Sequence, residues 1–419
     1  MQYGVGRLQP SNRLGALFLG TENAVYVSFD DGGKWQPLRQ NMGVTSVRDI
    51  IVKDDDLVAG THGRGFWILD DITPLRQIGA ATESEDVVLF EPTVAWRVRW
   101  NTSTDMPWPV EEPTGPNPPD GAIINYYLRQ PASGPVSLEI EDAQGRMVRR
   151  YSSSDTVAPI PQPANAPVPL YWYRAPQTLS AAAGMHRFVW DVHYQPIADS
   201  IGAGGGRGGL PITAIPHNSA PAPGTPWVPS GTYRVKLTAN GKTVSQSITV
   251  KQDPRVKTPA LTMQQVYAAT SALYFGAVDA QAAIVKATAW RDQIGTVRGS
   301  ASGDAAAALT AFERKLEAVV GAPAAGAGGR GGRGGGGGAP QAAAATPSAE
   351  TVQSVRTQLG GLMNSMQAAD VAPPANTLNA VAAARAAALR VMGKWKALET
   401  IDLPEVNARL RAAGVATFK

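Results

Sequence analysis

The sequence predicts a mixed multidomain protein in which a β-rich first region is followed by an antiparallel β-sandwich and then by an α-helical bundle. Short apolar runs with period-two alternation, separated by Gly, Pro, Asn and Asp, fill residues 16–253 and are typical of strands joined by tight turns. After residue 254 the apolar residues recur at steps of three and four, which indicates amphipathic helices. The predicted domains are residues 1–80, 85–253 and 254–419.

The first region, residues 1–80, contains strand-like runs at short intervals. These runs are 16–20, 24–29, 47–52, 56–60 and 66–69. A polar turn from Ser28 to Trp35 follows the second run. Asp30 can accept hydrogen bonds from the backbone amides of this turn, and Gly32 supplies the freedom for a positive φ. We expect Trp35 to bury its large ring.

Two motifs in this region resemble a known family. Ser28, Asp30, Gly32 and Trp35 match the S-x-D-x-G-x-x-W pattern of the Asp-box, or BNR, repeat at every defined position. The segment 61–71, T-H-G-R-G-F-W-I-L-D-D, resembles the ending of the sortilin-like propellers of bacterial multidomain proteins, many of which carry the label glycosyl hydrolase. The resemblance covers most of the first region, and the order of the downstream domains also fits such proteins.

The resemblance implies a partial β-propeller made of the last one to two blades. A blade of this family has four strands, with the Asp-box at the turn before the last strand. On that pattern residues 36–40 are the outer strand of one blade, and residues 47–69 supply three strands of the next. Because propellers have about four to eight blades, we expect the C-terminal part of a longer bacterial protein that is extracellular or periplasmic. The missing N-terminal blades of that parent would then be a partner of this chain.

The resemblance also implies roles for individual residues. It assigns Ser28, Asp30, Gly32 and Trp35 to a structural turn, usually away from the substrate. His62 and Arg64 lie on a Gly-rich turn and could line a binding face. The competing interpretation is that these two residues form hydrogen bonds at the end of a strand.

The middle region, residues 85–253, is predicted as an Ig-like antiparallel β-sandwich with Pro- and Gly-rich loops. Its strands are expected at 122–128, 136–141, 147–151, 186–192, 232–238 and 243–250. Asn240-Gly241 is a strong hairpin signal between the last two. The segment 229–235, P-S-G-T-Y-R-V, resembles Ig-like modules of the flagellar hook-cap and secretion-associated type.

Two features of the middle region have competing interpretations. Its aromatic residues could form a sugar-stacking surface, but burial in the sandwich core is the simpler interpretation. These residues are Tyr171, Trp172, Tyr173, Trp190, Tyr194 and Trp227. Gly204, Gly206 and Gly209 match G-x-G-x-x-G, yet a dinucleotide site needs a strand-to-helix turn and this segment reads as a loop. No cofactor is therefore expected.

Apolar stripes predict four helices in residues 254–419, along 263–287, 309–319, 352–366 and 381–398. Thr262 with Gln265 suggests a capping box, and Pro404 suits the first turn of a final short helix. Residues 321–347, rich in Gly, Ala and Arg, are predicted to be a flexible linker. They hold two Arg and no aromatic residue, which argues against RNA binding. A helix surface that binds another subunit stays open.

Composition and motifs exclude several kinds of chemistry. The 38 Lys and Arg against 34 Asp and Glu give a net charge of +4, too small to indicate a nucleic-acid partner. The absence of Cys excludes thiolate metal sites and Cys nucleophiles. No metal is expected, because His62, His186, His193 and His217 show no metal-ligand spacing. No apolar run reaches the length of about 18 residues that a membrane span needs.

The function expected from the sequence is non-catalytic. Glycosidases use two carboxylates at a set separation, and Glu22, Asp49 and Asp70 are candidates that nothing in the sequence pairs. The catalytic residues are thus unknown, and we expect a scaffold or a surface that binds a carbohydrate or protein ligand. The alternative is part of a glycoside hydrolase whose catalytic carboxylates lie in the missing propeller blades.

Overall fold

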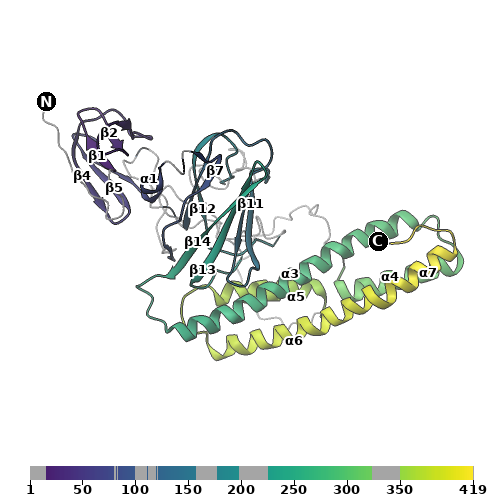
Figure 1. Cartoon of the computed structure of the whole chain (residues 1–419). Helices are drawn as coiled ribbons and strands as arrows, with labels where there is room; N and C mark the ends of the chain where they lie inside the picture. The colour runs from purple at the N-terminus through teal and green to yellow at the C-terminus, as the bar shows by residue number, and fades with distance from the viewer. Residues whose placement is uncertain are drawn as a thin grey trace. The chain divides into compact units, whose positions relative to one another are not determined.

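The computed structural model of the chain divides into two compact units (Figure 1). It describes residues 16–79, 82, 84–99, 111, 119, 121–156, 177–197, 225–322 and 350–418. The first unit contains the β-strands and comprises Met1–Gln195, Gly204–Ala222 and Val228–Val256. The second unit contains the long helices and comprises Pro196–Ala203, Pro223–Trp227 and Lys257–Lys419.

Two three-stranded antiparallel sheets open the first unit (Figure 1). The first sheet is β1 (Leu17–Gly20), β2 (Val25–Ser28) and β3 (Gln36–Pro37), and the second is β4 (Val47–Lys53), β5 (Asp56–Thr61) and β6 (Phe66–Leu69). In both sheets the strands lie in chain order, because short turns connect neighbouring antiparallel strands. The strand expected at 36–40 is shorter than predicted. Only Gln36 and Pro37 belong to β3, and Pro37 has no amide hydrogen to continue the ladder.

Each of the two sheets buries one apolar face, and the two buried faces form a shared cluster. Its members include Phe18, Val25 and Val27 from the first sheet and Ile50, Leu57 and Ala59 from the second. Gly20 allows this close approach, because a Cβ atom at Gly20 would lie 2.8 Å from Cγ1 of Val47. The alternation of buried and exposed residues along these strands is the period-two pattern that the sequence predicted.

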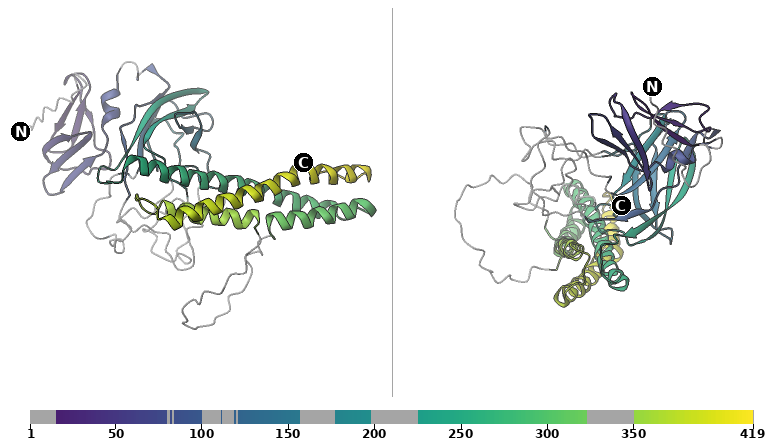
Figure 2. Two further views of the ribbon diagram at one scale, coloured as in Figure 1. Left: turned by 90° about the horizontal axis from the view of Figure 1, so that it is seen from below. Right: turned by 90° about the vertical axis from the view of Figure 1, so that its left-hand side faces the viewer.

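A five-stranded sheet and a second three-stranded sheet follow the short helix α1 (Thr73–Gln77). Their strands are β7 (Val87–Leu89), β8 (Ala95–Arg97), β9 (Ala122–Leu128), β10 (Ser137–Glu141), β11 (Met147–Ser152), β12 (Gly184–Trp190), β13 (Gly231–Ala239) and β14 (Lys242–Gln252). The sheet orders are β11-β10-β13-β14-β8 and β12-β9-β7, and only β8 with β14 is a parallel pair among these described strands. The five-stranded sheet is curled (Figure 2).

Side chains from these two sheets meet in an apolar core. Trp190 of β12 is fully buried, and its ring lies 5.5 Å from that of Tyr233 of β13. Tyr151 of β11 contacts Phe188 of β12 at 4.6 Å between ring centroids. The predicted Asn240-Gly241 hairpin is confirmed: the two residues have φ of 51° and 76° and connect β13 to β14.

The second unit is a set of packed helices. They are α3 (Ala260–Val297), α4 (Gly303–Val320), α5 (Val352–Met366), α6 (Ala375–Ala397), the π-helical turn η4 (Leu398–Asp402) and α7 (Leu403–Ala412). Helices α3 and α6 run side by side (Figures 1 and 2). Trp290 of α3 stacks on Trp395 of α6 at 5.0 Å, and Phe312 of α4 lies 5.8 Å from Trp290. Phe312 and Trp395 belong to the predicted apolar stripes, whereas Trp290 lies beyond the stripe predicted at 263–287 because α3 continues to Val297.

The capping prediction for the first helix was wrong. Helix α3 begins two residues before Thr262, and Pro259 precedes it without a side-chain cap. A capping box exists instead at α5, where Ser354 N donates to Thr351 Oγ1 and Thr351 N donates to Ser354 Oγ. Pro404 lies in the first turn of α7, as expected. The predicted linker 321–347 lies outside the described residues except for its first two positions.

One described helix, α3, is long and apolar enough to cross a membrane by length and composition. It buries Leu273, Ala277 and Trp290 in the helical unit. Because a core helix passes the same test, α3 is weak evidence for a membrane span.

The described strands and helices together make the chain a mixed α/β protein with several antiparallel sheets and C-terminal helices.

Candidate functional site

The Asp-box residues form a self-contained turn between β2 and β3. Ser28 Oγ donates to Asp30 Oδ1 at 2.9 Å and accepts from Gly32 N at 2.9 Å. Asp30 Oδ1 also accepts from Lys34 N at 2.8 Å. Gly32 has φ of 92°, a left-handed conformation that favours glycine. The hydrogen-bonding atoms of the motif therefore hold the turn itself.

The electrostatics of the turn follow from these hydrogen bonds. The pKa of Asp30 is lowered, chiefly by the hydrogen bond from the Lys34 amide and then by that from Ser28. Trp35 is not buried as predicted, since it remains 37% exposed. Its Cζ2 atom would lie 3.7 Å from a Cβ atom at Gly32, so the ring covers the turn instead of entering the core.

His62 and Arg64 occupy the exposed turn between β5 and β6. The backbone of this turn is well held, because both Thr61 N and Thr61 Oγ1 donate to Gly65 O. Trp67 Nε1 donates to Arg64 O at 3.1 Å. The backbone of His62 is also bonded, with its N donating to Ser46 O and its O accepting from Thr45 Oγ1. The backbone thus carries the strand-end bonds, and both side chains reach solvent.

The Asp-box turn and the His62–Arg64 turn belong to different sheets. Among the described residues no hydrogen bond or ion pair joins one turn to the other. The carboxylates considered for glycosidase chemistry are also separated in their contacts. Glu22 pairs with Arg48 at 3.4 Å, and Asp49 Oδ1 accepts from Ile50 N at 2.9 Å.

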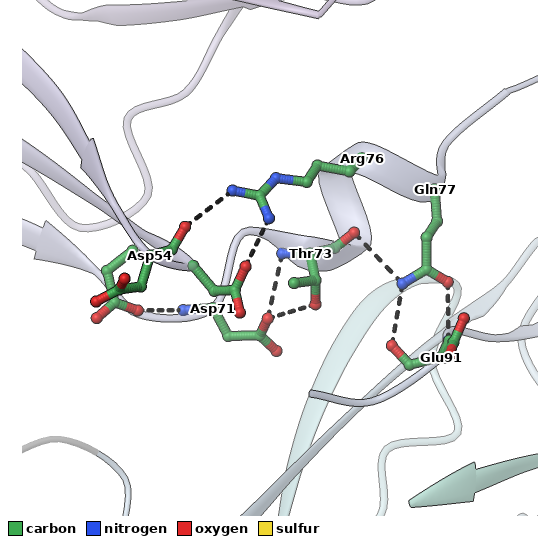
Figure 3. Close-up of polar contacts among 8 residues, drawn as sticks. Asp54, Asp71, Thr73, Arg76, Gln77 and Glu91 are labelled. Atoms are coloured by element: carbon green, nitrogen blue, oxygen red, sulfur yellow. Dashed lines mark hydrogen bonds and ion pairs between the residues drawn. The ribbon is translucent and has the colours of Figure 1, made fainter. Parts of the chain in front are cut away.

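A cluster of carboxylates and their partners lies where the second sheet meets α1 (Figure 3). Arg76 of α1 donates to Asp55 Oδ1 at 2.5 Å and to Asp54 O at 3.1 Å. Asp56 Oδ1 accepts from Asp71 N at 2.9 Å. Gln77 Nε2 donates to Glu91 O at 3.0 Å, and Glu91 N donates back to Gln77 Oε1 at 2.8 Å. These bonds fasten the β4–β5 turn and the segment after α1.

Asp71 connects this cluster to the next sheet. It is 4% exposed and has a φ of 51°. Its carboxylate accepts from both the amide and the hydroxyl of Thr73 and from Asn125 Nδ2, the last at 3.0 Å. Arg187 donates to Asp71 O at 2.9 Å and to Asn125 Oδ1 at 3.1 Å. The sequence did not predict this network, because Asn125 and Arg187 are distant in the chain.

Asp70 precedes Asp71 in the chain, and its environment resembles that of a general acid. Partial burial raises its pKa, the nearby Asp56 raises it further, and Arg187 opposes the shift. Such environments occur in acid–base sites. However, Asp56 is already bonded to a backbone amide, so the described contacts fit a structural joint better than a catalytic pair.

A second buried polar cluster follows β12, which ends two residues earlier than predicted. Val192 has a φ of 51°, a strained conformation for a β-branched residue, and is 1% exposed. Its carbonyl accepts from Val228 N at 2.9 Å. His193 N donates to Asp191 Oδ1 at 3.2 Å, and His193 Nδ1 lies 2.6 Å from Asp191 O.

Burial dominates the electrostatics around His193. It lowers the pKa of His193, with Arg99 and Arg149 acting in the same direction and Asp191 opposing them. Burial of the Tyr151 hydroxyl and the charge of Asp191 raise the pKa of Tyr151. From the sequence, His193 was considered only as a possible metal ligand. The available local signal was the Asp191 side chain two residues earlier, which can bond the His193 amide as in an Asx-turn.

Two of the six aromatic residues of the middle region are buried in the β-rich unit, as the simpler interpretation predicted for them. Trp190 and Tyr194 are buried at 0% and 3% exposure, and Trp227 is half-buried. Tyr171, Trp172 and Tyr173 lie outside the described residues, as do Gly204, Gly206, Gly209 and His217. Within the described part of the chain, no group of three or more His, Asp or Glu residues is arranged to hold a metal ion.

Comparison of the chain with family models, with curated proteins and with solved structures gave no match.

Proposed function

We propose that this chain contributes blades of an Asp-box β-propeller, an Ig-like β-sandwich and a helical region to a secreted bacterial protein. Its role is that of a scaffold that presents a binding surface for a carbohydrate or protein ligand. In this proposal the two opening sheets are consecutive blades, and the sheets of residues 87–252 are the sandwich. The ligand would be bound without being hydrolysed.

The observation that carries this proposal is the use of the Asp-box side chains. Both hydrogen-bonding side chains of the motif, Ser28 and Asp30, are spent on amides of the motif or on each other. A turn bonded in this way stabilises a strand connection, which supports a structural role for the motif. The packing of two successive sheets through apolar faces supports the stacking of blades.

The His62–Arg64 turn is the proposed ligand-binding element. A held backbone with exposed polar side chains is pre-organised, because little conformational entropy is lost on binding. Arg64 offers several donors in a fixed fork, and His62 can donate or accept. These groups suit the hydroxyl and carboxylate groups of a carbohydrate or the acidic side chains of a protein.

The hydrolase alternative has one specific observation in its favour, the raised pKa of Asp70 beside Asp56. A retaining or inverting glycosidase needs one protonated and one ionised carboxyl group flanking the bond. Asp56, the other carboxylate, accepts a hydrogen bond from the backbone amide of Asp71 and so has a structural role. We therefore prefer the binding role.

The full chain should be tested on a glycan array and in a reducing-sugar release assay with the bound glycans. We expect binding without release of reducing ends. The double variant His62→Ala/Arg64→Ala should lose binding with an unchanged circular dichroism spectrum. Arg48→Ala, an exposed arginine on the neighbouring strand, is the matched control and should bind normally.

Release of reducing sugar that disappears in Asp70→Asn would favour the hydrolase instead. Binding that survives in His62→Ala/Arg64→Ala would remove the turn from the proposal.

A further inference from the structure

The turn that follows β12 places a strained residue next to a buried histidine. Val192 has a φ of 51°, which is unfavourable for a β-branched residue. Such strain persists only where the surrounding contacts hold the backbone in place. Val192 is 1% exposed and His193 4% exposed, so both lie inside the β-rich unit. Contacts with other segments therefore keep this turn in its conformation.

Three hydrogen bonds hold the turn and the residues after it. Val228 N donates to Val192 O at 2.9 Å, and Gln195 N donates to Val148 O on β11 at 2.9 Å. The fully buried ring of Trp190 donates from Nε1 to a carbonyl of the same turn at 3.1 Å. If the turn left its place, the amides of Val228 and Gln195 would lose these partners and exchange with water.

The position of the His193 ring determines which of its nitrogens carries the hydrogen. Nδ1 lies 2.6 Å from Asp191 O, and a carbonyl oxygen can only accept, so Nδ1 is the donor. In the neutral ring Nε2 then carries no hydrogen, and a proton taken up in acid adds to Nε2. Because the ring is buried, the resulting positive charge would be created away from water.

Three described segments place charged groups around His193. Asp191 precedes it, Arg149 lies on β11 and Arg99 follows β8. Burial is the main cause that lowers the pKa of His193, the two arginines lower it further, and Asp191 opposes them. The hydroxyl of Tyr151 on β11 also lies near Asp191, but it stays uncharged because burial raises its pKa.

We propose that this turn is a pH-sensitive latch, which opens when His193 takes up a proton. A charged imidazole is better solvated in water than inside the protein, so protonation favours the conformation in which the turn has left its buried place. Opening also relieves the strain at Val192. The segment after β12 then separates from β11 and from Val228, while the sheets stay paired. This latch goes beyond the proposed binding role and does not depend on it.

The latch should be closed at neutral pH and should open in acid. In the open turn His193 has the ordinary His pKa of about 6.5, and in the closed turn its pKa is lower because of burial. The closed form is therefore fully favoured above the ordinary value and loses stability as the pH falls below it. One proton changes the opening equilibrium by at most about tenfold for each pH unit.

Amide hydrogen exchange of the full chain at several pH values tests the latch, with each rate divided by the intrinsic rate at that pH. We expect the protection of the Val228 and Gln195 amides to fall roughly tenfold between about pH 7 and pH 5. The amides of the β13–β14 ladder should keep their protection over this range. This contrast separates opening of the turn from acid unfolding of the whole unit.

His193→Asn removes the titrating group and keeps a nitrogen donor near the position of Nδ1. It should lose most of the pH dependence of the Val228 and Gln195 amides. His186→Gln is the matched control, because His186 Nε2 lies 2.7 Å from Ala182 O and glutamine retains a donor there. The control should show the pH dependence of the wild type.

Arg149→Gln serves as a second variant if His193→Asn impairs folding. Glutamine can still donate to Tyr194 O, which Arg149 Nη1 contacts at 2.9 Å. Removing one repelling charge makes protonation of the closed turn less unfavourable. The fall in protection between neutral and acidic pH should therefore be smaller than in the wild type.

Protection of Val228 and Gln195 that does not change with pH would overturn the proposal. It would also be overturned by a fall that persists undiminished in His193→Asn or, where that variant does not fold, in Arg149→Gln. Simultaneous loss of protection in the β13–β14 ladder would show acid unfolding of the unit and would equally exclude a local latch.

Discussion

Asp30 and Asp71 each use one carboxylate to bind a backbone amide and a side-chain donor. The role of Asp30 was predictable, because all its partners lie within four residues and the S-x-D-x-G spacing defines them. The role of Asp71 was not, because its partner Asn125 is 54 residues away. The prediction that Trp35 is buried was wrong, because the ring of a Trp after a tight turn can pack either against the turn or into the core.

Asp70 provides a test of the cost of partly burying a carboxylate, to which the charge of Asp56 adds. Its raised pKa means that the folded state binds this proton more tightly than the unfolded chain does. The stability that the proton contributes is present below the ordinary Asp pKa of about 3.9 and is lost as the pH rises through the folded value. Asp70→Asn imitates the protonated group, so we expect its unfolding temperature at pH 7 to exceed that of the wild type by a few degrees.

Thermal unfolding of Asp70→Asn at several pH values measures this effect. The difference from the wild type should shrink as the pH falls toward the ordinary Asp value. Asp31→Asn is the control, because it makes the same substitution at an exposed position. A variant that is less stable than the wild type at pH 7 would mean that the Asp70 carboxylate is attractively paired.

Most strands matched their predicted bounds within a residue or two, whereas α3 extends ten residues beyond its predicted end and α4 and α6 begin six residues before their predicted starts. Short apolar runs predicted β9 at its observed bounds and placed β4 to β6 within a residue or two. β12 ends at Trp190 because Val192 takes a left-handed conformation that no propensity would predict for valine. Thr262 and Gln265 fit the spacing of a capping box, which predicted that the helix starts after Thr262. Because α3 already begins at Ala260, both residues lie inside the helix and do not cap it.

The packing of the two opening sheets makes Gly20 sensitive to substitution. A Cβ atom there would approach Val47 Cγ1 to 2.8 Å, so Gly20→Ala should lower the free energy of unfolding by about 1–3 kcal/mol. In Gly20→Ala/Val47→Ala the loss should be smaller than the sum of the single losses, because the clash is relieved. Chemical denaturation of the four proteins gives the coupling.

Gly134→Ala is the control for Gly20→Ala, because nothing lies within 4 Å of a Cβ atom at Gly134. It should leave the denaturation midpoint nearly unchanged. Additive losses for Gly20 and Val47 would contradict the close approach of β1 and β4.

The molecule as a whole consists of two compact units with separate cores. The β-rich unit is built around residues such as Trp190 and Tyr233, and the helical unit around the stacked rings of Trp290 and Trp395. Proteins of several domains commonly unfold in more than one transition. We therefore expect two transitions on heating.

Trp290→Ala tests the independence of the two units. Removing this fully buried ring should destabilise the helical unit by about 3–5 kcal/mol. Only the transition in which the helical circular dichroism signal is lost should then move to a lower temperature. Leu389→Ala, at an exposed position of α6, should move neither transition. If Trp290→Ala shifts both transitions together, the two units unfold as one.

Local residue order accounts for the turns, the strand and helix patterns and the division into a β-rich and a helical part. The hydrogen bonds of the Asp-box join residues at most four positions apart. The side-chain periods of strands, 2.0 residues, and of helices, 3.6 residues, can likewise be recognised within a single segment. Packing between distant segments accounts for the Asp71–Asn125–Arg187 network and the buried His193. These features depend on which surfaces meet, and that depends on contacts between residues that no sequence window contains.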